Sequence, residues 1–388
     1  MKALNNNAHP LESLLQQHCP NGVEFKELGE VTIQNAFKQL GASELERLKT
    51  NNGNIRLLPS SNNNDWCSNE ELCKNYICDG EIITLGRARY ANLKYHKGKF
   101  VSSNNIIIQA KNDILCKYLY YFIATHTKNF YVETPTYPKF DNQIFQKTQI
   151  PIPPLEIQQK IVEILDAFTE LQAELQAELQ ARRKQYEYYR NKLLSFEELE
   201  KRANAIGGGL KLVTLGEVCE IGTGKSNRSD CADDGEYPLY VRSAVPLRTN
   251  NYHFDEEAVV LPGEGGIGDI FHYVNGKYAL HQRAYRIHPK TKYLNVKFMY
   301  FYLFANFKLY IRQVAVNATV MSIRLPMLEN FQIPLPPLAV QNDIVEILDK
   351  FDTLANDLSA GLPAEIDARQ KQYEHYREQL LSFREKCE

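Results

Sequence analysis

A stretch of eighteen residues occurs twice in this chain with few changes. Residues 149–166 read QIPIPPLEIQQKIVEILD, and residues 332–349 read QIPLPPLAVQNDIVEILD. A long internal repeat is the sequence signature of one structural unit that is built more than once. The chain must therefore fold as two copies of a single plan.

Shorter matches on both sides extend the repeat over most of the 388 residues. They follow the same order in each copy: VEFKELGEV (23–31) with LKLVTLGEV (210–218), KYLYYFI (117–123) with KFMYFYL (297–303), and ARRKQYEYYRNKLLSFEE (181–198) with ARQKQYEHYREQLLSFRE (368–385). The chain thus reads as module, long segment, module, long segment. We predict five parts: an N-terminal helical segment at 1–22, a first module at 23–151, a first spacer helix at 152–208, a second module at 209–334 and a second spacer helix at 335–388.

The two long segments have the periodicity of helices that pack against one another. After Pro153-Pro154, apolar and aromatic residues return at steps of mostly four and three, from Ile157 to Phe196. The second copy continues in the same way from Val340 to Phe383. This spacing is typical of a coiled-coil seam, so the two helices are natural partners. The alternative is that each seam packs only on its own module.

A four-residue unit is written three times in the first long segment, as TELQAELQAELQ at 169–180. Each unit lengthens a helix by roughly 6 Å and rotates its end by about 40°, and coiled coils accommodate such an insertion as a stutter. We interpret the unit as an adjustable ruler, in which the number of units sets the helix length and so the distance between the two modules. The alternative is a plain run of good helix formers. In the second copy, Gly361-Leu362-Pro363 predicts that the helix kinks, or breaks and restarts.

The modules between the long segments have the residue composition of β-strands. Runs such as GEIITLG (80–86) and EEAVVLPG (256–263) are rich in β-branched residues and are bounded by Gly, Pro and Asn. An expected helix follows each set of strands, DILCKYLYYFIATH in the first module and YLNVKFMYFYLFANF in the second. We therefore predict an α+β protein of two mixed α/β modules and two long coiled-coil helices, with an internal pseudo-twofold repeat.

The composition limits the kinds of partner. With 44% hydrophobic and 24% charged residues the chain is an ordinary globular protein. It has no apolar run of about 18 residues and no signal-peptide core, so we expect a cytoplasmic protein with no membrane partner. The formal net charge of −2 argues against a generic polybasic nucleic-acid binder.

The charge is nevertheless segregated along the chain. Residues 270–328 hold nine Lys or Arg and no Asp or Glu, and residues 82–140 hold nine basic against two acidic residues. Residues 156–200 reverse this, with ten acidic and six basic residues. Two basic blocks divided by an acidic spacer predict two modules that face anions.

No motif predicts catalysis, a metal or a cofactor. GTGKS (222–226) resembles a phosphate-binding loop, but Cys219 stands where the full pattern needs a glycine. GEGGIGD (263–269) lacks the GxGxxG order and predicts a sharp turn. The eight cysteines form no CxxC pair and no zinc-module spacing, so we expect reduced thiols and no metal.

The repeated stretch, the AELQ units and KQYEYYRNKLLSF together resemble the specificity subunit of type I restriction-modification enzymes. HCPNGVEFKELGEV (18–31) extends the resemblance over nearly the whole chain. The resemblance implies two target-recognition domains, each reading one half of a split sequence in double-stranded DNA, held apart by an antiparallel pair of helices. It also implies no enzymatic activity of its own and no cofactor, with methyltransferase (modification) subunits and restriction (motor and nuclease) subunits as partners. Two other classes stay open: an enzyme with its own nuclease or methyltransferase site, and an architectural coiled-coil scaffold.

Antiparallel pairing has a consequence for how DNA is bound. It gives the chain an approximate twofold axis that can coincide with the twofold axis of duplex DNA. Because the modules differ outside their shared landmarks, we expect the two half-sites to differ as well.

Residues that contact DNA are expected among the basic, amide and aromatic side chains of the modules. In the first module we select Arg87, Arg89, Tyr90, Lys94, Lys97, Lys99, Tyr137 and Lys139. In the second module we select Lys225, Arg228, Arg242, Lys277, His281, Gln282, Arg283 and Arg324. The alternative for each is a solvated surface charge, and for His281 a buried histidine with satisfied hydrogen bonds.

The repeated Tyr and Arg residues near the ends of the long segments are candidates for docking the methyltransferase, with coiled-coil packing as the alternative role. They are Tyr186, Tyr189 and Arg190 in the first copy and Tyr373, Tyr376 and Arg377 in the second.

Overall fold

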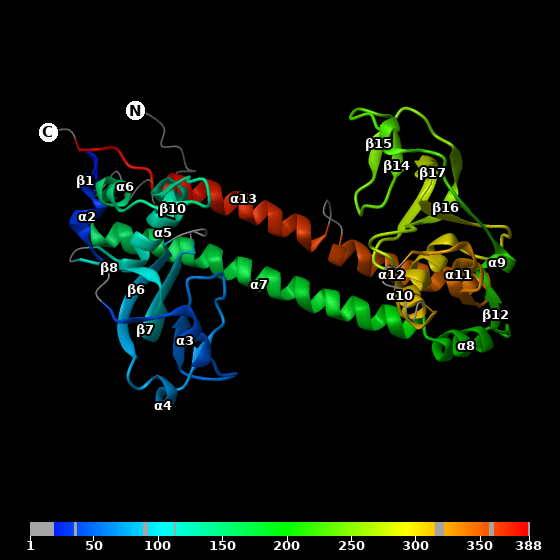
Figure 1. Ribbon diagram of the computed structural model, residues 1–388, viewed down its shortest axis with the longest axis horizontal. Coiled ribbons are helices and arrows are strands. Elements are labelled where there is room, and N and C mark those ends of the chain that lie inside the picture. The colour runs from blue at the N-terminus through cyan, green and yellow to red at the C-terminus, as the bar shows by residue number, and fades with distance from the viewer. Residues whose placement is uncertain are drawn as a thin grey trace, which may run out of the picture. The chain divides into compact units, whose positions relative to one another are not determined.

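Contacts within the chain divide it into two units, whose elements are shown in Figure 1. Unit 1 comprises residues 1–174 and 366–388, and unit 2 comprises residues 175–365. The computed structural model describes residues 19–34, 37–87, 92–111, 114–314, 322–356 and 361–386. Most of the helical segment predicted at 1–22 therefore lies outside the described residues.

Unit 1 is built on one mixed sheet. Its strands are β2 (Thr32–Gln34), β3 (Gln39–Leu40), β4 (Ile55–Leu58), β5 (Cys67–Ser68), β6 (Cys78–Gly86), β7 (Lys94–Ser103) and β8 (Asn105–Ala110). They lie in the order β2-β8-β6-β7-β4-β5, and β3 pairs with β7 beside this path. β6 and β7 form a long antiparallel pair, from Cys78 opposite Phe100 to Thr84 opposite Lys94, whereas β4 runs parallel to β7.

Unit 2 repeats this sheet. Its strands are β13 (Cys219–Thr223), β14 (Tyr237–Tyr240), β15 (Leu247–Thr249), β16 (Phe254–Pro262), β17 (His272–Leu280) and β18 (Ala284–Pro289). Their order is β13-β18-β16-β17-β14-β15, again with β14 parallel to β17. Each strand takes the place of its counterpart in unit 1. The repeat thus extends through segments whose sequences share few residues, and the prediction of two mixed α/β modules is confirmed.

Shorter elements frame the two sheets. In unit 1 they are β1 (Glu24–Glu27), α2 (Leu28–Val31), α3 (Ala42–Arg47), α4 (Glu70–Cys73), α5 (Cys116–His126), η1 (Thr127–Phe130), β9 (Tyr131–Val132), β10 (Lys139–Phe140), α6 (Asn142–Lys147) and β11 (Gln149–Ile152). In unit 2 they are α8 (Phe196–Ala205), β12 (Lys211–Thr214), α9 (Leu215–Val218), η2 (Arg228–Asp230), α10 (Val296–Val314), α11 (Leu325–Glu329), β19 (Gln332–Leu335) and α12 (Leu338–Asn356). The strand that opens each module pairs antiparallel with the strand that closes it, β1 with β11 and β12 with β19.

Each module has one helix that covers a face of its sheet. In unit 2, Phe298, Phe301 and Phe307 of α10 are buried in one cluster with Val259 of β16 and Ile287 of β18. The matching cluster of unit 1 joins α5 to β6 and β8. Burying each of these large side chains contributes on the order of 2 kcal/mol, so this layer is the main core of each module.

A buried glutamine fastens each long helix to its module. Gln158 lies in the first turn of α7 (Leu155–Leu193), where its Oε1 accepts from the N–H of Leu115 at 2.9 Å and its Nε2 donates to the carbonyl of Pro153 at 2.8 Å. Gln341 of α12 repeats the arrangement, accepting from the N–H of Asn295 and donating to the carbonyl of Pro336, both at 2.8 Å. Both glutamines are fully buried. The PPL-x-x-Q pattern of the repeat therefore encodes a clamp between the long helix and the start of α5 or α10.

An ion pair completes each clamp two turns further along the long helix. Lys117 of α5 pairs with Asp166 of α7, and Lys297 of α10 pairs with Asp349 of α12, each with 2.6 Å between Nζ and Oδ2. These pairs are about two-thirds buried, which protects them from solvent screening more than a surface pair. The repeated lysine and aspartate are thus explained by their contact with one another.

The long helices also pair with one another within unit 1. Gln172 of α7 donates to Gln370 of α13 (Leu362–Leu380) at 2.7 Å, and the ring of Phe168 lies 5.5 Å from that of Tyr376. Residue numbers rise along α7 as they fall along α13, so the two helices are antiparallel. In unit 2, Tyr189 of α7 stacks on Phe351 of α12 at 5.5 Å. The predicted antiparallel pairing is confirmed, and the start of each seam packs on its own module as well.

The long segments break at two places. α13 begins at Leu362, where the N–H groups of Ala364 and Glu365 donate to the carbonyl of Gly361, so the predicted restart is confirmed. The structure departs from a single helix across 152–208, because α7 ends at Leu193 and α8 begins after Ser195. The serine hydroxyl accepts from the N–H of Glu198, and this cap starts a new helix.

Two classes of feature are missing from the described part of the chain. Its helices include none with both the length and the apolar character that a bilayer span requires. In the same residues, His, Cys, Asp and Glu side chains form no group of three that could hold a metal ion.

The glutamine clamp gives a first prediction. Gln158→Leu should lower the free energy of unfolding of unit 1 by about 2 kcal/mol, because a buried N–H and a buried carbonyl both lose their partners. Urea denaturation followed by circular dichroism measures this loss. Gln159→Leu is the matched control, since Gln159 is the exposed neighbour on the same turn. An equal loss of stability in both variants would contradict the clamp.

Candidate nucleic-acid interface

Two of the selected arginines of unit 2 meet at one carboxylate. Arg242 follows β14, Arg283 lies in the turn between β17 and β18, and Glu264 follows β16. Glu264 Oε2 lies 3.3 Å from Nη1 of Arg242 and 3.2 Å from Nη1 of Arg283. All three side chains are about half-exposed, so these pairs add little stability. They do hold two guanidinium groups side by side at the end of the sheet.

A cavity of about 500 Å³ opens beside this cluster. It is lined by Arg228, Val241, Arg242, Ser243, Leu247, Glu264, Gly265 and His281. Three of the selected residues line this cavity. Arg283 does not line it but forms an ion pair with Glu264, which does. The structure thus brings together four residues that are spread over 56 positions of the sequence, from Arg228 to Arg283.

His281 holds the turn that carries Arg283. Its Nδ1 accepts from the backbone N–H of Arg283 at 3.0 Å, so the ring proton is assigned to Nε2. Burial lowers the pKa of His281, and the positive charges of Arg242 and Arg283 lower it further. At neutral pH the ring is therefore neutral, with one nitrogen satisfied inside the turn and an N–H donor on the other.

The GTGKS segment is explained by backbone packing. A Cβ atom on Gly224 would lie 1.7 Å from the carbonyl oxygen of Leu280, so only a glycine fits there. The next residues continue the contact: the N–H of Ser226 donates to Leu280, and the N–H of Gln282 donates to Ser226. This packing leaves the side chains of Lys225 and Gln282 exposed next to the cavity-lining turn.

The other two selected residues of unit 2 do not line the cavity. Lys277 of β17 places its Nζ over the ring of Tyr252 at 4.7 Å. Arg324 is exposed at the N-cap of α11, two residues after Ser322, whose backbone bridges to that of Glu264.

One arginine of the second basic block is used inside the fold. Arg286 of β18 is 8% exposed and pairs with Glu256 of β16 at 2.9 Å and with Glu220 of β13. Its guanidinium also lies over the ring of Phe254 at 4.7 Å. Its charge is neutralised within the sheet, so the block faces solvent with less positive charge than the sequence count indicates.

Lys94 of unit 1 is likewise committed to the fold. Its Nζ donates to the carbonyls of Pro59, Ser61 and Asn63 at 2.7 to 2.9 Å, which satisfies all three N–H groups of the ammonium. Burial, with a smaller effect from Arg56, lowers the pKa of Lys94 to about 8. Lys94 therefore fastens the loop after β4 to the start of β7.

Three further selected residues of unit 1 have partners within it. Lys97 of β7 pairs with Glu81 directly across the strand pair at 3.4 Å, and Lys99 pairs with Glu70 of α4. Arg87 donates to the carbonyl of Asn105 at 3.4 Å. Lys97, Lys99 and Arg87 remain exposed or half-exposed, so each can exchange this partner for a phosphate.

The remaining selected residues of unit 1 lie near β10 or outside the described residues. Lys139 is exposed and its Nζ lies 5.7 Å from the ring centre of Tyr137. Arg89 and Tyr90 fall outside the described residues.

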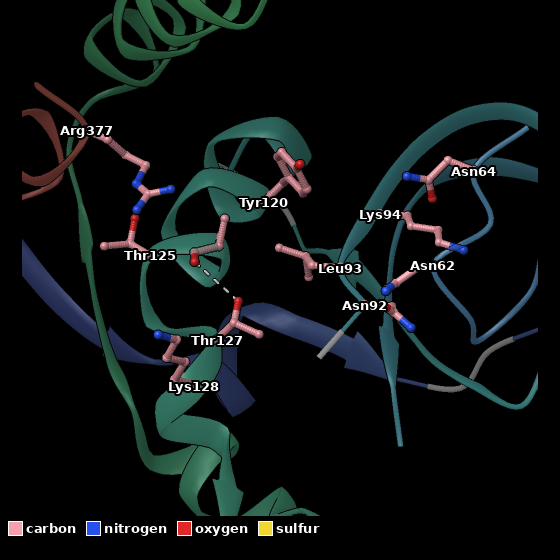
Figure 2. A pocket seen from close by; sticks show the side chains of 11 residues that line it. Asn62, Asn64, Asn92, Leu93, Lys94, Tyr120, Thr125, Thr127, Lys128 and Arg377 are labelled. Atoms are coloured by element: carbon pink, nitrogen blue, oxygen red, sulfur yellow. Dashed lines mark hydrogen bonds between the residues drawn. The ribbon is translucent and has the colours of Figure 1, made fainter. Parts of the chain in front are cut away.

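A larger cavity, of about 620 Å³, lies in unit 1 and is shown in Figure 2. It is lined by Asn62, Asn64, Asn92, Leu93, Lys94, Tyr120, Ala124, Thr125, Thr127, Lys128 and Arg377. Its lining contains three cationic side chains and three amides, and no carboxylate.

Most of this lining was missed by sequence reasoning. Lys94 is the one selected residue in it. Lys128 belongs to the first basic block but is not among the selected residues, and Arg377 is a candidate for docking the methyltransferase or for coiled-coil packing rather than for a DNA contact. The run of asparagines at 62–64 was the available signal, because clustered amides in a loop are typical of base or phosphate contacts.

Comparison with known protein families shows that both copies of the repeat match one family domain. The type I restriction modification DNA specificity domain matches the chain twice, at residues 20–182 and 208–368. A putative type I restriction enzyme specificity subunit of Haemophilus influenzae is 30% identical over 98% of this chain and 100% of its own length. A type I restriction enzyme specificity subunit of Escherichia coli is 34% identical over 70% of this chain and 72% of its own length.

Solved structures agree with the fold. The S subunit of a type I restriction-modification system from M. genitalium aligns with a TM-score of 0.64 at 15% identity, over 98% of both chains. A chain from a structural study of complex assembly in a type I restriction-modification system aligns with a TM-score of 0.58 at 16% identity, over 93% of this chain and 98% of its own. The two matches to the family domain cover most of the sequence, and the chain belongs to the type I restriction modification DNA specificity domain family.

Proposed function

We propose that this chain is the DNA specificity subunit of a type I restriction-modification system. It reads an asymmetric target made of two half-sites, with residues 23–151 and 209–334 as the two target-recognition domains. It recruits methyltransferase subunits for modification and restriction subunits for cleavage. Because its target is cellular and invading DNA, we place it in the cytoplasm.

The observation that carries this proposal is that the family domain occurs twice in one chain, on two sheets of the same strand order. Two similar scaffolds supply two reading sites, and a target of two half-sites follows. The residues at the ends of the two sheets differ, from the Glu264 cluster in unit 2 to the amide-rich cavity in unit 1. Different side chains present different donor and acceptor patterns to the base edges, which supports two different half-sites.

In unit 2 we propose the cavity beside Glu264 as the reading site. Arg242 and Arg283 supply paired donors of the kind that recognise guanine, while Lys225, Arg228, Lys277 and Arg324 supply phosphate contacts. His281 and Gln282 present donors from the same turn. In unit 1 we propose Arg87, Arg89, Tyr90, Lys97, Lys99, Tyr137 and Lys139 as contacts, with Lys94 holding the loop beside them.

We further propose that the chain has no active site of its own. Its relatives are named as specificity subunits, and His281 and Lys94, which line the two cavities, are hydrogen-bonded to backbone groups rather than arranged as a nucleophile and a base. The rival proposals are an enzyme with its own nuclease or methyltransferase site and a purely architectural scaffold.

Methylome sequencing of the source strain, with and without this gene, tests the proposal. A methylated motif of two unlike halves separated by a fixed gap should disappear with the gene. The purified chain should show neither DNA cleavage nor methyl transfer from S-adenosylmethionine. Activity of the chain alone would favour the enzyme, and an unchanged methylome together with no DNA protection by the assembled complex would favour the scaffold.

The Glu264 cluster predicts a loss of discrimination rather than of binding. Glu264→Gln should leave affinity for mixed-sequence DNA unchanged or higher, since a negative charge is removed. It should reduce the preference for the target over a target with one substituted base pair by about tenfold, because the two arginines are no longer held in place. Competition binding with the methyltransferase assembly measures both quantities.

Glu346→Gln provides the matched control for this variant. It removes the same charge from an exposed ion pair with Lys350 on α12, and its discrimination should equal that of the wild type. Unchanged discrimination in Glu264→Gln would contradict the assignment of the reading site.

The ruler interpretation of the AELQ units gives another prediction. Deleting residues 175–178 removes one LQAE unit from α7, shortening the helix by roughly 6 Å and rotating its end by about 40°. The methylated motif should keep both half-sites and change the number of base pairs between them. Duplicating the same four residues should change the gap in the opposite direction. A changed half-site sequence with an unchanged gap would count against the ruler.

A further inference from the structure

The cavity of unit 1 has two chemically different walls. Figure 2 shows Arg377, Thr125 and Lys128 on one side of it and Asn62, Asn64 and Asn92 on the other. The first wall is formed by α5, η1 and α13. The second is formed by the loop after β4 and the residues just before β7. A cationic wall facing an amide wall, without a carboxylate in the lining, is suited to an anion that also accepts hydrogen bonds.

Arg377 is held by an aromatic ring and has unused hydrogen-bonding capacity. Its guanidinium lies over the ring of Tyr373, with 5.3 Å between Cζ and the ring centre. Its buried Nε has no hydrogen-bond partner in the structure. Among the described residues, no carboxylate forms an ion pair with its side chain. Arg377 is thus placed as a fixed fork of donors whose charge is not neutralised inside the fold.

The internal repeat supplies a direct comparison for this arginine. The segments QYEYYR and QYEHYR place Arg190 of unit 2 at the position equivalent to Arg377. Arg190 also lies over its own tyrosine, Tyr186, at 5.5 Å, and its buried Nε likewise has no hydrogen-bond partner. The ring of Phe304, however, covers its guanidinium at 4.9 Å, and only 9% of Arg190 is exposed.

The residue equivalent to Phe304 explains the difference. Aligning KYLYYFIA with KFMYFYLF puts Ala124 of unit 1 at this position. A methyl group replaces a phenyl ring, and Ala124 lines the cavity of unit 1 together with Arg377. The same alignment pairs Lys128 with Lys308. Lys308 forms an ion pair with Asp269, whereas Lys128 has no such pair among the described residues.

Both cations that unit 2 covers or neutralises are therefore available in unit 1. We propose that the unit 1 cavity receives one backbone phosphate of the DNA strand held by unit 1, with Arg377 as its main cation. Lys128 adds a second positive charge, and the amides of Asn62 and Asn64 face the same phosphate and its sugar. Lys94 keeps the amide wall in place through its three carbonyl contacts. This inference rests on the proposed DNA-binding function and assigns a phosphate contact to Arg377 that its covered equivalent in unit 2, Arg190, cannot make.

The experiment measures DNA binding by the full chain assembled with its methyltransferase subunits, over a range of salt concentrations. Arg377→Gln should weaken binding by about tenfold for target and mixed-sequence DNA alike. It should also reduce the slope of log affinity against log salt by about one, as expected for one lost phosphate contact. Ala124→Phe should have a similar effect on affinity without removing a charge, because the new ring covers Arg377 as Phe304 covers Arg190.

Arg190→Gln is the matched control. It removes the repeat-equivalent arginine, whose guanidinium is covered by Tyr186 and Phe304 and so is open neither to DNA nor to a methyltransferase subunit. Its salt slope should equal that of the wild type even if its thermal stability falls. A second control uses the DNA: replacing single phosphates of the target by neutral methylphosphonates should reveal one position that weakens wild-type binding but does not further weaken Arg377→Gln.

The outcomes separate the two proposals. Wild-type affinity and salt slope in both Arg377→Gln and Ala124→Phe would overturn the phosphate contact while leaving the specificity function intact. A change in the methylated motif of Arg377→Gln, with an unchanged salt slope, would also overturn it, because the residue would then act on base recognition. Failure of the wild-type assembly to bind any duplex would overturn the specificity function, and the phosphate contact with it.

Discussion

The fold depends on a polar clamp that joins each long helix to its module. A coiled-coil helix made of Leu, Ile, Gln and Glu packs with many partners and in several registers, so apolar contacts alone do not fix where it meets a module. The fully buried Gln158 and Gln341 remove this freedom, because each must satisfy specific backbone groups on either side of the junction. The Lys117–Asp166 and Lys297–Asp349 pairs then set the rotation of the helix two turns on. Burying a glutamine in place of an apolar side chain gives up some hydrophobic stabilisation. In return, the long helix can meet its module in only one position.

This explains which residues the two copies share and which they do not. The shared landmarks are the strand pairs β1-β11 and β12-β19, the start of the long helix, and the face of α5 or α10 that meets it. These residues hold module and helix together, and they are needed equally in both copies. The loops at the ends of the sheets are outside this framework, so their sequences are free to differ. The Glu264 cluster and the amide-rich loop at 62–64 both lie in such loops.

The sequence was sufficient for the repeat, the helix seam and the class of the modules, because these depend on periodicity and on residues close together along the chain. The strand order was beyond it, since no local pattern indicates that β14 and β4 run parallel to their neighbours. For the candidate site, the sequence could not show which basic residues are neutralised by carboxylates on neighbouring strands. The basic block at 270–328 contains no acidic residue, yet Arg286 is neutralised by Glu256 and Glu220, which lie 30 and 66 residues away. Lys97 meets Glu81 for the same reason, because strand pairing places them opposite one another. Counting charges along a chain therefore overestimates the charge that faces a ligand whenever adjacent strands are distant in sequence.

The duplicated arginines show how a repeat separates structural from functional requirements. Arg190 and Arg377 lie over their tyrosines at nearly the same distance, 5.5 and 5.3 Å, so this stacking belongs to the shared framework. What differs is the residue across from the guanidinium, Phe304 in one copy and Ala124 in the other. A buried, covered arginine gains packing and cation–π contacts, whereas an uncovered one keeps its donors available to an anion. A single position on the module helix thus decides whether the same arginine acts as part of the core or as part of a binding surface, and the long helix needs no change of its own.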